Sequence, residues 1–337
     1  MHDEILIGTL LAVLGGVMQG SFVFPMRSIS GWRWENTWLI YSIAALLVVP
    51  ICVASVTVPG LASLYTSAPA GAIATAALFG FAWGLANVLF GLAVSAVGMS
   101  VTFSIVCGLS ASLGALVPLL VSAPERILQR SGLHILTGVA LALIGVSLIG
   151  AAGRRRETKA GAALSSGATG KGILLAVAAG VLAPALNFSL AFGKQIINTA
   201  VQQGAAATSS GDAIWVVCLA GGFVSNGGYA VLKLNRAQSW TGFGAKSPLS
   251  NWLLGALMGL LFTGGILLYS RGAGLLGRLG PVIGWPVFQA TMVLTSTLLG
   301  TLSGEWRGAH RQLVLMVIGG LSTLIVAILV LSLANRA

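Results

Sequence analysis

The sequence predicts an all-α polytopic membrane protein, with ten transmembrane helices arranged as two inverted five-helix repeats. Composition supports the first part of this prediction. Of the 337 residues, 56% are hydrophobic and 7% are charged, whereas about 25% of the residues in soluble domains are charged. Such a chain cannot cover a water-facing surface, which excludes a soluble enzyme and a disordered protein. The number of apolar runs and an internal repeat support the second part.

The net charge of +11 does not indicate nucleic acid binding. The basic residues lie in short loops between apolar runs, where Lys and Arg set the orientation of membrane proteins. We therefore expect membrane lipid around the chain and no nucleic acid partner.

Ten apolar runs are long enough to cross a bilayer, which takes about 20 residues. They are continuous and about twice the length of a barrel strand, so they predict helices rather than alternating strands. The first run has no basic segment before it and is too long for a cleavable signal peptide. The predicted spans are 5–26, 37–57, 72–95, 98–122, 133–152, 172–193, 213–234, 251–270, 281–303 and 311–333.

The longest polar stretch between spans, 153–171, is rich in Ala, Gly and Ser and predicts a basic, flexible linker. It separates a first repeat, 1–152, from a second repeat, 172–337. Residues 8–17 align without a gap on 172–181, with seven identical positions. Because each half has an odd number of spans, the second half enters from the opposite side and is inverted. This architecture is typical of secondary transporters, whose substrate sites lie near the midplane between the repeats.

Lys and Arg are distributed unequally between the two sides of the membrane. Twelve lie on the side of the linker and six on the side of the termini. The twelve are Arg27, Arg33, Arg154, Arg155, Arg156, Lys159, Lys171, Lys233, Arg236, Lys246, Arg307 and Arg311. The positive-inside rule then predicts a cytoplasmic linker and two termini outside.

Five amide side chains fall inside the predicted spans. They are Gln19, Asn87, Asn187, Asn226 and Gln289. An amide in lipid without a partner is costly, so each must meet another helix or line a wet cavity. Amide donors and acceptors match the hydroxyl groups of a sugar. Interhelical bonding and cavity lining are equal alternatives for each of the five.

Aromatic residues accompany two of these amides one helical turn away. Trp83 precedes Asn87 on span three, and Trp285 precedes Gln289 on span nine, so each pair shares one helix face. Phe262 on span eight and Phe103 on span four occupy the positions that match Trp83 and Trp285 in the other repeat. Since a flat ring packs on the apolar face of a pyranose, this pattern favours a small sugar, with ordinary core packing as the alternative.

Titratable groups are scarce in the spans. All seven acids lie near span ends or in loops. Glu35 and Glu305 are the closest candidates for a proton carrier, because such a carrier needs a group that can titrate. Their alternatives are structural: Glu35 stabilises a helix N-terminus, and Glu305 lies close to Arg307.

The chain shows no metal-ligand spacing, no nucleophile with an adjacent base and no phosphate loop. We therefore expect no metal, no cofactor and no enzyme activity. The one GxGxxG string, Gly272–Gly277, follows no strand and opens no βαβ unit. We expect it to form a loop between spans eight and nine.

Several segments resemble the L-rhamnose–proton symporter family of the drug/metabolite transporter superfamily, along most of the chain. They are Pro25 with Trp32-Arg33-Trp34-Glu35-Asn36-Thr37-Trp38, Phe79-Gly80 with Trp83-Gly84 and Asn87, Gly91-Leu92, Gly98-Met99-Ser100, Lys194, Asn226 after Gly221-Gly222, Trp285 and Glu305-Trp306. The resemblance implies a ten-helix inverted-repeat fold in the bacterial inner membrane and import of a 6-deoxyhexose with a proton. Spans eight and nine depart from the family's rhamnose carriers: 261–269 carries fewer aromatic residues and no Gln, and the start of span nine, 280–286, lacks polar residues.

Together, these observations predict a secondary transporter that imports L-rhamnose or a related small neutral sugar, coupled to a proton, by alternating access. Trp83, Phe103, Phe262 and Trp285 would pack on the sugar. Asn87, Asn187, Asn226 and Gln289 would bond its hydroxyl groups, with Gln19 as a further candidate. An exporter of amphipathic metabolites on the same fold and a non-transporting membrane sugar sensor are the alternatives.

Overall fold

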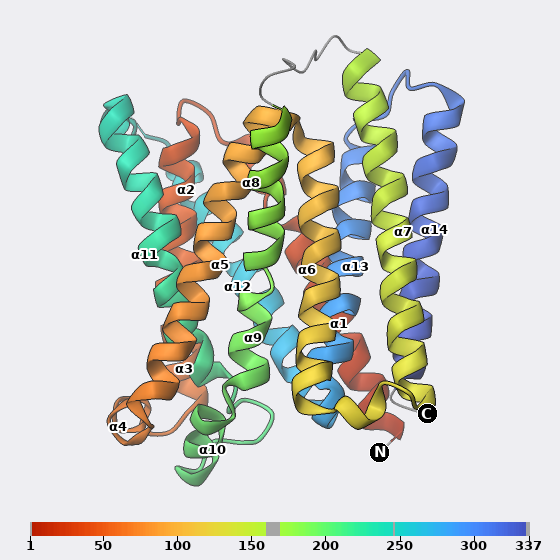
Figure 1. The fold of residues 1–337 in the computed structure, drawn as a ribbon. Coiled ribbons are helices and arrows are strands. Elements are labelled where there is room, and N and C mark those ends of the chain that lie inside the picture. The colour runs from red at the N-terminus through yellow and green to blue at the C-terminus, as the bar shows by residue number, and fades with distance from the viewer. Residues whose placement is uncertain (1, 160–168, 245–246, 335–337) are drawn as a thin grey trace.

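The computed structural model describes residues 2–159, 169–244 and 247–334, and in these ranges it contains helices and turns but no strand. Ten of its helical segments are long and apolar enough to cross a membrane (Figure 1). Each corresponds to one predicted span, so the prediction of an all-α protein with ten transmembrane helices is confirmed.

The bounds of the elements are as follows. Span one is α1 (His2–Ser21) followed by η1 (Phe24–Ser28), and span two is α2 (Trp34–Ile43), η2 (Ala44–Val48) and α3 (Val49–Thr57). Spans three, four and five are α5 (Ala70–Val97), α6 (Met99–Ser122) and α7 (Arg130–Lys159). Span six is α8 (Thr169–Leu182), α9 (Ala185–Phe192) and α10 (Lys194–Gln202). Spans seven to ten are α11 (Asp212–Ala237), α12 (Leu249–Leu275), α13 (Gly280–Leu302) and α14 (Arg311–Leu333). The short connectors are α4 (Leu61–Ser67), η3 (Pro124–Arg126), η4 (Ser239–Phe243) and η5 (Gly277–Leu279).

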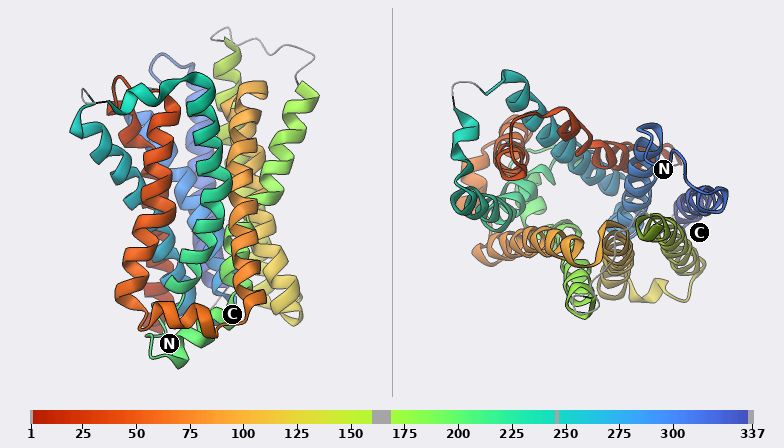
Figure 2. Two further views of the ribbon diagram at one scale, coloured as in Figure 1. Left: turned by 90° about the vertical axis from the view of Figure 1, so that its left-hand side faces the viewer. Right: turned by 90° about the horizontal axis from the view of Figure 1, so that it is seen from above.

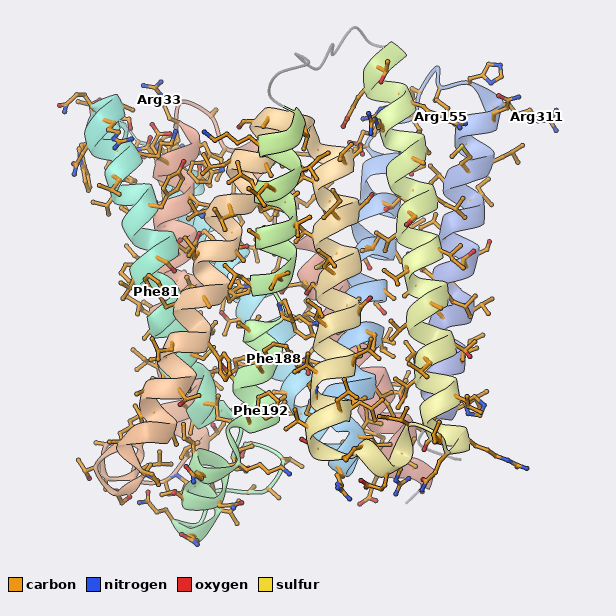
Figure 3. All side chains as sticks on the ribbon, in the orientation of Figure 1. Arg33, Phe81, Arg155, Phe188, Phe192 and Arg311 are labelled. Carbon is orange, nitrogen blue, oxygen red and sulfur yellow. The ribbon has the colours of Figure 1, made fainter. Side chains whose placement is uncertain are left out.

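The two ends of the bundle differ in the segments they carry. One end, the upper face, holds the end of α7 and the start of α8, and the other, the lower face, holds both chain ends with α4 and α10 (Figure 1). Arg33, Arg155 and Arg311 all lie at the upper face (Figure 3). The position of these three arginines at one face therefore agrees with the predicted succession of spans.

Proline explains an interruption in each of spans two and six. Proline has no N–H and cannot continue the helical ladder. In span six, Pro184 separates α8 from α9, so that α9 starts a new turn in the middle of the bundle. In span two, the π-helical turn η2 lies just before Pro50, and such turns insert one extra residue into a helix. The break in span six matters for the site, because α9 carries Asn187.

The helices pack in a repeating set of pairs. Figure 2 shows them side by side around the middle of the bundle, with α7 against α14 at one end. Helix α1 packs on α12 and α13, and α8 packs on α5 and α6. Helix α11 packs on α5, and α12 packs on α2. Helix α6 packs on α7 and α13 on α14, and the pairs α2–α11 and α6–α13 are also in contact.

Glycine permits the closest of these approaches. A Cβ on Gly80 of α5 would overlap the carbonyl oxygen of Cys218 on α11, and a Cβ on Gly221 of α11 would overlap the carbonyl oxygen of Ala77. Backbone therefore lies directly on backbone, as in the small-residue interfaces of membrane helices.

We expect Gly80→Ala to lower the free energy of unfolding by about 3 kcal/mol, because the added methyl group forces α5 and α11 apart. Gly228→Ala on α11 is the matched control, since nothing lies within 4 Å of its added Cβ and alanine is the better helix former. The midpoint of thermal unfolding in detergent measures both. A Gly80→Ala protein as stable as the parent would contradict this packing.

Two local predictions are corrected. Helix α7 continues to Lys159, so 153–159 is helical rather than part of a flexible linker, while 160–168 lies outside the described residues. The GxGxxG string is not a loop from its start, because α12 continues to Leu275. Gly272 lies within α12 and packs on Gly8, whose carbonyl oxygen would be 2.5 Å from a Cβ at Gly272. The need for a close approach to α1, rather than a turn, explains this glycine.

Candidate functional site

A cavity of about 1000 Å³ extends from the upper face to the middle of the bundle. Its lining comes mainly from α5, α6 and α13, with parts of α1, η1, α2 and α7 and with Phe262 of α12, so that both halves of the chain contribute. Its mouth carries Arg27, Arg156, Lys233 and Trp306, and its deep end carries Trp285. We call it the upper cavity. Its volume lies at the upper end of the range for small-molecule sites.

One wall of the upper cavity is a continuous chain of aromatic rings. Trp83 lies 5.4 Å from Phe262 between ring centroids, and Phe262 lies 5.7 Å from Tyr41. Tyr41 lies 4.8 Å from Trp38, which stacks on Trp34 at 5.0 Å. Since each ring is held by its neighbours, the wall offers fixed flat faces to a ligand.

A second aromatic group forms the deep end. Trp285 stacks on Phe288 with centroids 5.6 Å apart, and its indole N–H donates to the carbonyl oxygen of Ser110 at 3.0 Å. Tyr269 packs on both rings. Both tryptophans predicted for the site, Trp83 and Trp285, therefore line the same cavity, together with Phe262 and Phe103.

Three of the five predicted amides also line the upper cavity. Gln289 donates to Ser110 Oγ at 2.9 Å, and Asn87 donates to the carbonyl oxygen of Trp83 at 3.3 Å. Gln19 is 8% exposed, and its Oε1 has no hydrogen-bond partner among the described residues. A buried amide oxygen without a partner is costly. Gln19 is therefore the clearest candidate to receive a hydroxyl from a ligand.

The other two amides lie outside the lining of the upper cavity and bond protein groups. Asn226 on α11 accepts from Trp38 Nε1 at 3.0 Å and donates to Ser42 Oγ at 3.5 Å. Asn187 on α9 donates to the carbonyl oxygens of Gly114 at 2.8 Å and Pro281 at 3.1 Å. Asn226 orients Trp38 in the aromatic wall, and Asn187 lies beneath the deep end. Direct sugar contacts by these two residues stay a prediction.

The two predicted acids lie at the upper face in different surroundings. Glu35 is 7% exposed, accepts a hydrogen bond from Ser239 Oγ at 2.7 Å and lies 3.5 Å from Arg33 Nε. Glu305 lies at the mouth of the upper cavity, 45% exposed, with its Oε1 3.7 Å from Arg156 Nη2. Glu35 therefore joins α2 to η4, while Glu305 is open to water and to the cavity.

Sequence reasoning overlooked a third acid, Asp212, at the lower start of α11. It is 1% exposed, and its Oδ2 accepts from Thr57 at 2.9 Å and from Arg271 Nη2 at 3.0 Å. Its Oδ1 and Arg271 Nε are buried without a partner among the described residues. A signal was present in the sequence, because Asp212 begins span seven and Arg271 follows span eight, so both lie at the same face. Pairing could be anticipated from this placement, but not burial.

Comparison with known proteins places the whole chain in one family. The sequence model described as L-rhamnose-proton symport protein (RhaT) matches residues 1–336. The chain belongs to this family. The L-rhamnose-proton symporter of Klebsiella pneumoniae (strain 342) is 27% identical over 334 residues, which cover 97% of each chain. The L-rhamnose-proton symporter of Cronobacter sakazakii (strain ATCC BAA-894) is 28% identical with the same coverage.

Membership of the RhaT family decides between the protein classes left open by the sequence. Its curated relatives are named as symporters and not as enzymes. The ten apolar helices together with this bacterial family make the chain a multi-pass protein of the inner membrane. The predictions of a transporter and of the RhaT family are therefore confirmed.

Proposed function

We propose that this RhaT-family protein imports L-rhamnose or a closely related neutral deoxy sugar together with a proton, by alternating access. The observation that carries the proposal is the upper cavity. It reaches the middle of the bundle, its walls are flat aromatic faces, and its polar groups there are uncharged amides and hydroxyls. A polyol with one apolar face fits such a site. The names of the relatives supply the specific sugar and the proton.

The fold behind this function is a pair of inverted five-helix repeats, 1–152 and 172–337, in the manner of the drug/metabolite transporter superfamily. The packing pairs support this. When each span is exchanged with the one five places along, the α1–α12 pair becomes α8–α5, and α1–α13 becomes α8–α6. Likewise α6–α7 becomes α13–α14, and α11–α5 becomes α2–α12. A set of contacts that survives this exchange is expected of a two-fold axis in the membrane plane.

The upper face is the cytoplasmic one in this proposal, and both termini lie outside. The positive-inside rule supports this orientation, because Arg27, Arg33, Arg156 and Lys233 all lie at the upper face. Two further basic residues counted for this side, Lys159 and Lys246, have side chains outside the described residues. The upper cavity is then open to the cytoplasm, and the structure corresponds to the inward-open state.

Each lining group has a role in the proposed site. Trp83, Phe262, Phe103 and Trp285 pack on the sugar ring, and Gln19, Asn87 and Gln289 bond its hydroxyl groups. Asn226 and Asn187 can bond hydroxyl groups of the sugar only in a state in which their hydrogen bonds to protein groups are broken. The departure of span eight from the rhamnose carriers affects this wall, because Phe262 is the aromatic residue that span eight contributes to it.

Glu305 and Glu35 are the proposed proton carriers. Glu305 lies on the path between the cavity and the cytoplasm. Its carboxylate can bind either the Arg156 guanidinium, with which it forms an ion pair, or a proton. Glu35 is buried at the end of the aromatic wall that starts with Trp34. Each carboxylate releases its basic neighbour when it is protonated, which links proton binding to movement at the upper face.

Counterflow in proteoliposomes tests the function. With unlabelled L-rhamnose inside, we expect labelled L-rhamnose added outside to accumulate transiently, and related deoxy sugars to suppress the accumulation. An imposed pH gradient, acid outside, is expected to raise net uptake. Glu305→Gln or Glu35→Gln is expected to retain counterflow and lose the response to the gradient, since counterflow needs no net proton movement.

The outcomes separate the alternatives. No counterflow from folded protein contradicts sugar transport and favours a sensor if the sugar still binds. Counterflow only with apolar metabolites favours an exporter. A gradient response that persists in both glutamine variants excludes these two acids as proton carriers.

A further inference from the structure

A second cavity of about 260 Å³ lies toward the lower face. We call it the lower cavity. Its lining includes Ser122 at the end of α6, Lys194 at the start of α10, Gly211 before α11, Ser270 on α12 and Pro281 on α13. None of these residues lines the upper cavity. The two cavities therefore approach the middle of the bundle from opposite faces.

The lining elements of the two cavities are related by the same exchange of spans. The upper cavity is bordered by the ends of spans one, three and nine and the starts of spans two and four, and also by the ends of spans five and seven. The lower cavity is bordered by the ends of spans six, eight and four, the start of span nine and the loop before span seven. Exchanging each span with its partner five places along converts the first five elements of the upper cavity into those of the lower cavity, while the ends of spans five and seven have no counterpart there. The lower cavity thus occupies the place that the upper cavity would take at the opposite face.

A thin layer centred on Asn187 separates the two cavities. The Asn187 side chain, which is fully buried, donates to the carbonyl oxygens of Gly114 on α6 and Pro281 on α13 and accepts from the Tyr269 hydroxyl on α12. Tyr269 in turn packs on Trp285, which lines the upper cavity. One side chain of α9 therefore holds three helices together between the cavities.

We propose that the lower cavity is the outer sugar-binding station of the transport pathway, contracted in this state, and that the Asn187–Tyr269 pair is its gate. The proposal rests on the proposed import function for its ligand, a neutral monosaccharide. In the outward-open state the upper cavity closes toward the cytoplasm, the gate parts so that the lower cavity reaches the midplane, and the Asn187 amide exchanges its protein partners for sugar hydroxyls.

The chemistry of the lower cavity suits such a ligand. Ser122, Thr208, Ser210 and Ser270 line it together with Lys194 and Arg278, all of which carry groups that can donate to sugar oxygens. Its volume in this state is slightly below the range of small-molecule sites. Every polar atom of the Asn187 amide group has a partner in the closed state, so opening leaves these groups unbonded unless water or a hydroxyl-bearing ligand replaces the partners. A sugar can replace them, whereas an apolar solute cannot.

Thiol labelling from outside tests the gate without any need for transport. In a background without Cys52, Cys107 and Cys218, Ser270→Cys places a thiol in the lower cavity at a position that is 5% exposed. Tyr269→Phe removes one gate hydrogen bond and leaves the Asn187 oxygen with one partner fewer. We expect the rate of reaction with a membrane-impermeant maleimide to rise about tenfold, equivalent to 1.4 kcal/mol. Asn187→Leu is the second gate variant, with the same expected direction.

Three controls make the result specific. Gly274→Cys lies in the same cavity one turn along α12, is exposed and has no atom within 4 Å of its Cβ. It is expected to react at one rate whatever the state of the gate, and its reaction from outside also reports orientation. Tyr65→Phe removes a hydrogen bond to the carbonyl oxygen of Ala213, away from both cavities, and is expected to leave the Ser270→Cys rate unchanged. Ser296→Cys, in the upper cavity, is expected to react more slowly from the cytoplasmic side in the gate variants.

The outcomes are distinguishable from those of the proposed function. Faster labelling in both gate variants, with slower labelling in the upper cavity, supports the gate even if L-rhamnose counterflow fails. Unchanged labelling in folded variants that retain counterflow overturns the gate and leaves sugar import standing. The outer station is tested by adding saturating L-rhamnose to the Ser270→Cys protein that also carries Tyr269→Phe. A slower labelling rate at Ser270→Cys supports sugar binding in the lower cavity. An unaltered labelling rate at that concentration excludes it.

Discussion

Replacement of Trp83 by alanine is expected to abolish sugar uptake while the protein still inserts and remains folded. Trp83 is 7% exposed, lies in the middle of α5 and lines the upper cavity beside Phe262. A sugar face that covers about 100 Å² of the ring loses about 2.5 kcal/mol of binding free energy, which lowers affinity by a factor of about 70. Loss of the ring also removes a neighbour that holds Phe262 in place, which adds to the effect.

The measurement is uptake of labelled L-rhamnose, with membrane content and size-exclusion profile recorded for each variant. Trp252→Ala is the matched control, because it removes an indole from α12 outside both cavities. Asn87→Ala, one turn along α5 from Trp83, is expected to reduce uptake in the same way through lost hydrogen bonds. Normal uptake by both the Trp83→Ala and Asn87→Ala proteins would show that the sugar binds elsewhere.

The second large effect is expected at the buried ion pair of the lower face. Arg271→Met leaves the Asp212 carboxylate buried with Thr57 as its remaining partner. Breaking a buried pair by removing one member is strongly destabilising. Because the Arg271 side chain is 34% exposed, we expect a loss of about 2–3 kcal/mol in the free energy of unfolding, at the lower limit for such pairs.

A double-mutant cycle checks this result through the midpoint of thermal unfolding in detergent. Asp212→Asn together with Arg271→Met removes both charges and is expected to be more stable than Arg271→Met alone. The exposed pair of Arg278 with Glu125, with side chains 58% and 49% exposed, is the control. Arg278→Met is expected to change the free energy of unfolding by less than about 1 kcal/mol. Additive losses in the cycle would mean that Asp212 and Arg271 do not stabilise each other.

The spans could be predicted from the sequence because hydropathy and length are local properties. The order of the polar and apolar runs was sufficient for all ten helices. Helix ends were less accurate. Helix α7 extends through three consecutive arginines, since nothing at 153–159 stops a helix once it leaves the membrane.

The site could be predicted only in part, because spacing along a helix does not show which neighbour a residue meets. Trp83 and Trp285 line one cavity, as expected. Asn87 lines it too, but Asn187 and Asn226 lie outside it and bond protein groups, and nothing in the sequence distinguishes these three asparagines. Tyr41 and Phe288 were not anticipated, although both line the upper cavity. Asp212 was overlooked because its burial arises from α3 and α12, which are distant in sequence.

The interruption of span six at Pro184 has an electrostatic consequence. Since Pro184 cannot donate, the carbonyl group of Gly180 loses its helical partner in the middle of a low-dielectric layer. The end of α8 and the start of α9 then present opposed partial charges of about half an elementary charge, beside Ala183 and Leu186 in the upper cavity. A backbone dipole can attract the hydroxyl groups of a neutral solute without the ion-binding strength of a fixed charge. The protein can thus have a polar midpoint for sugar although no described acid or base lies in the middle of a span.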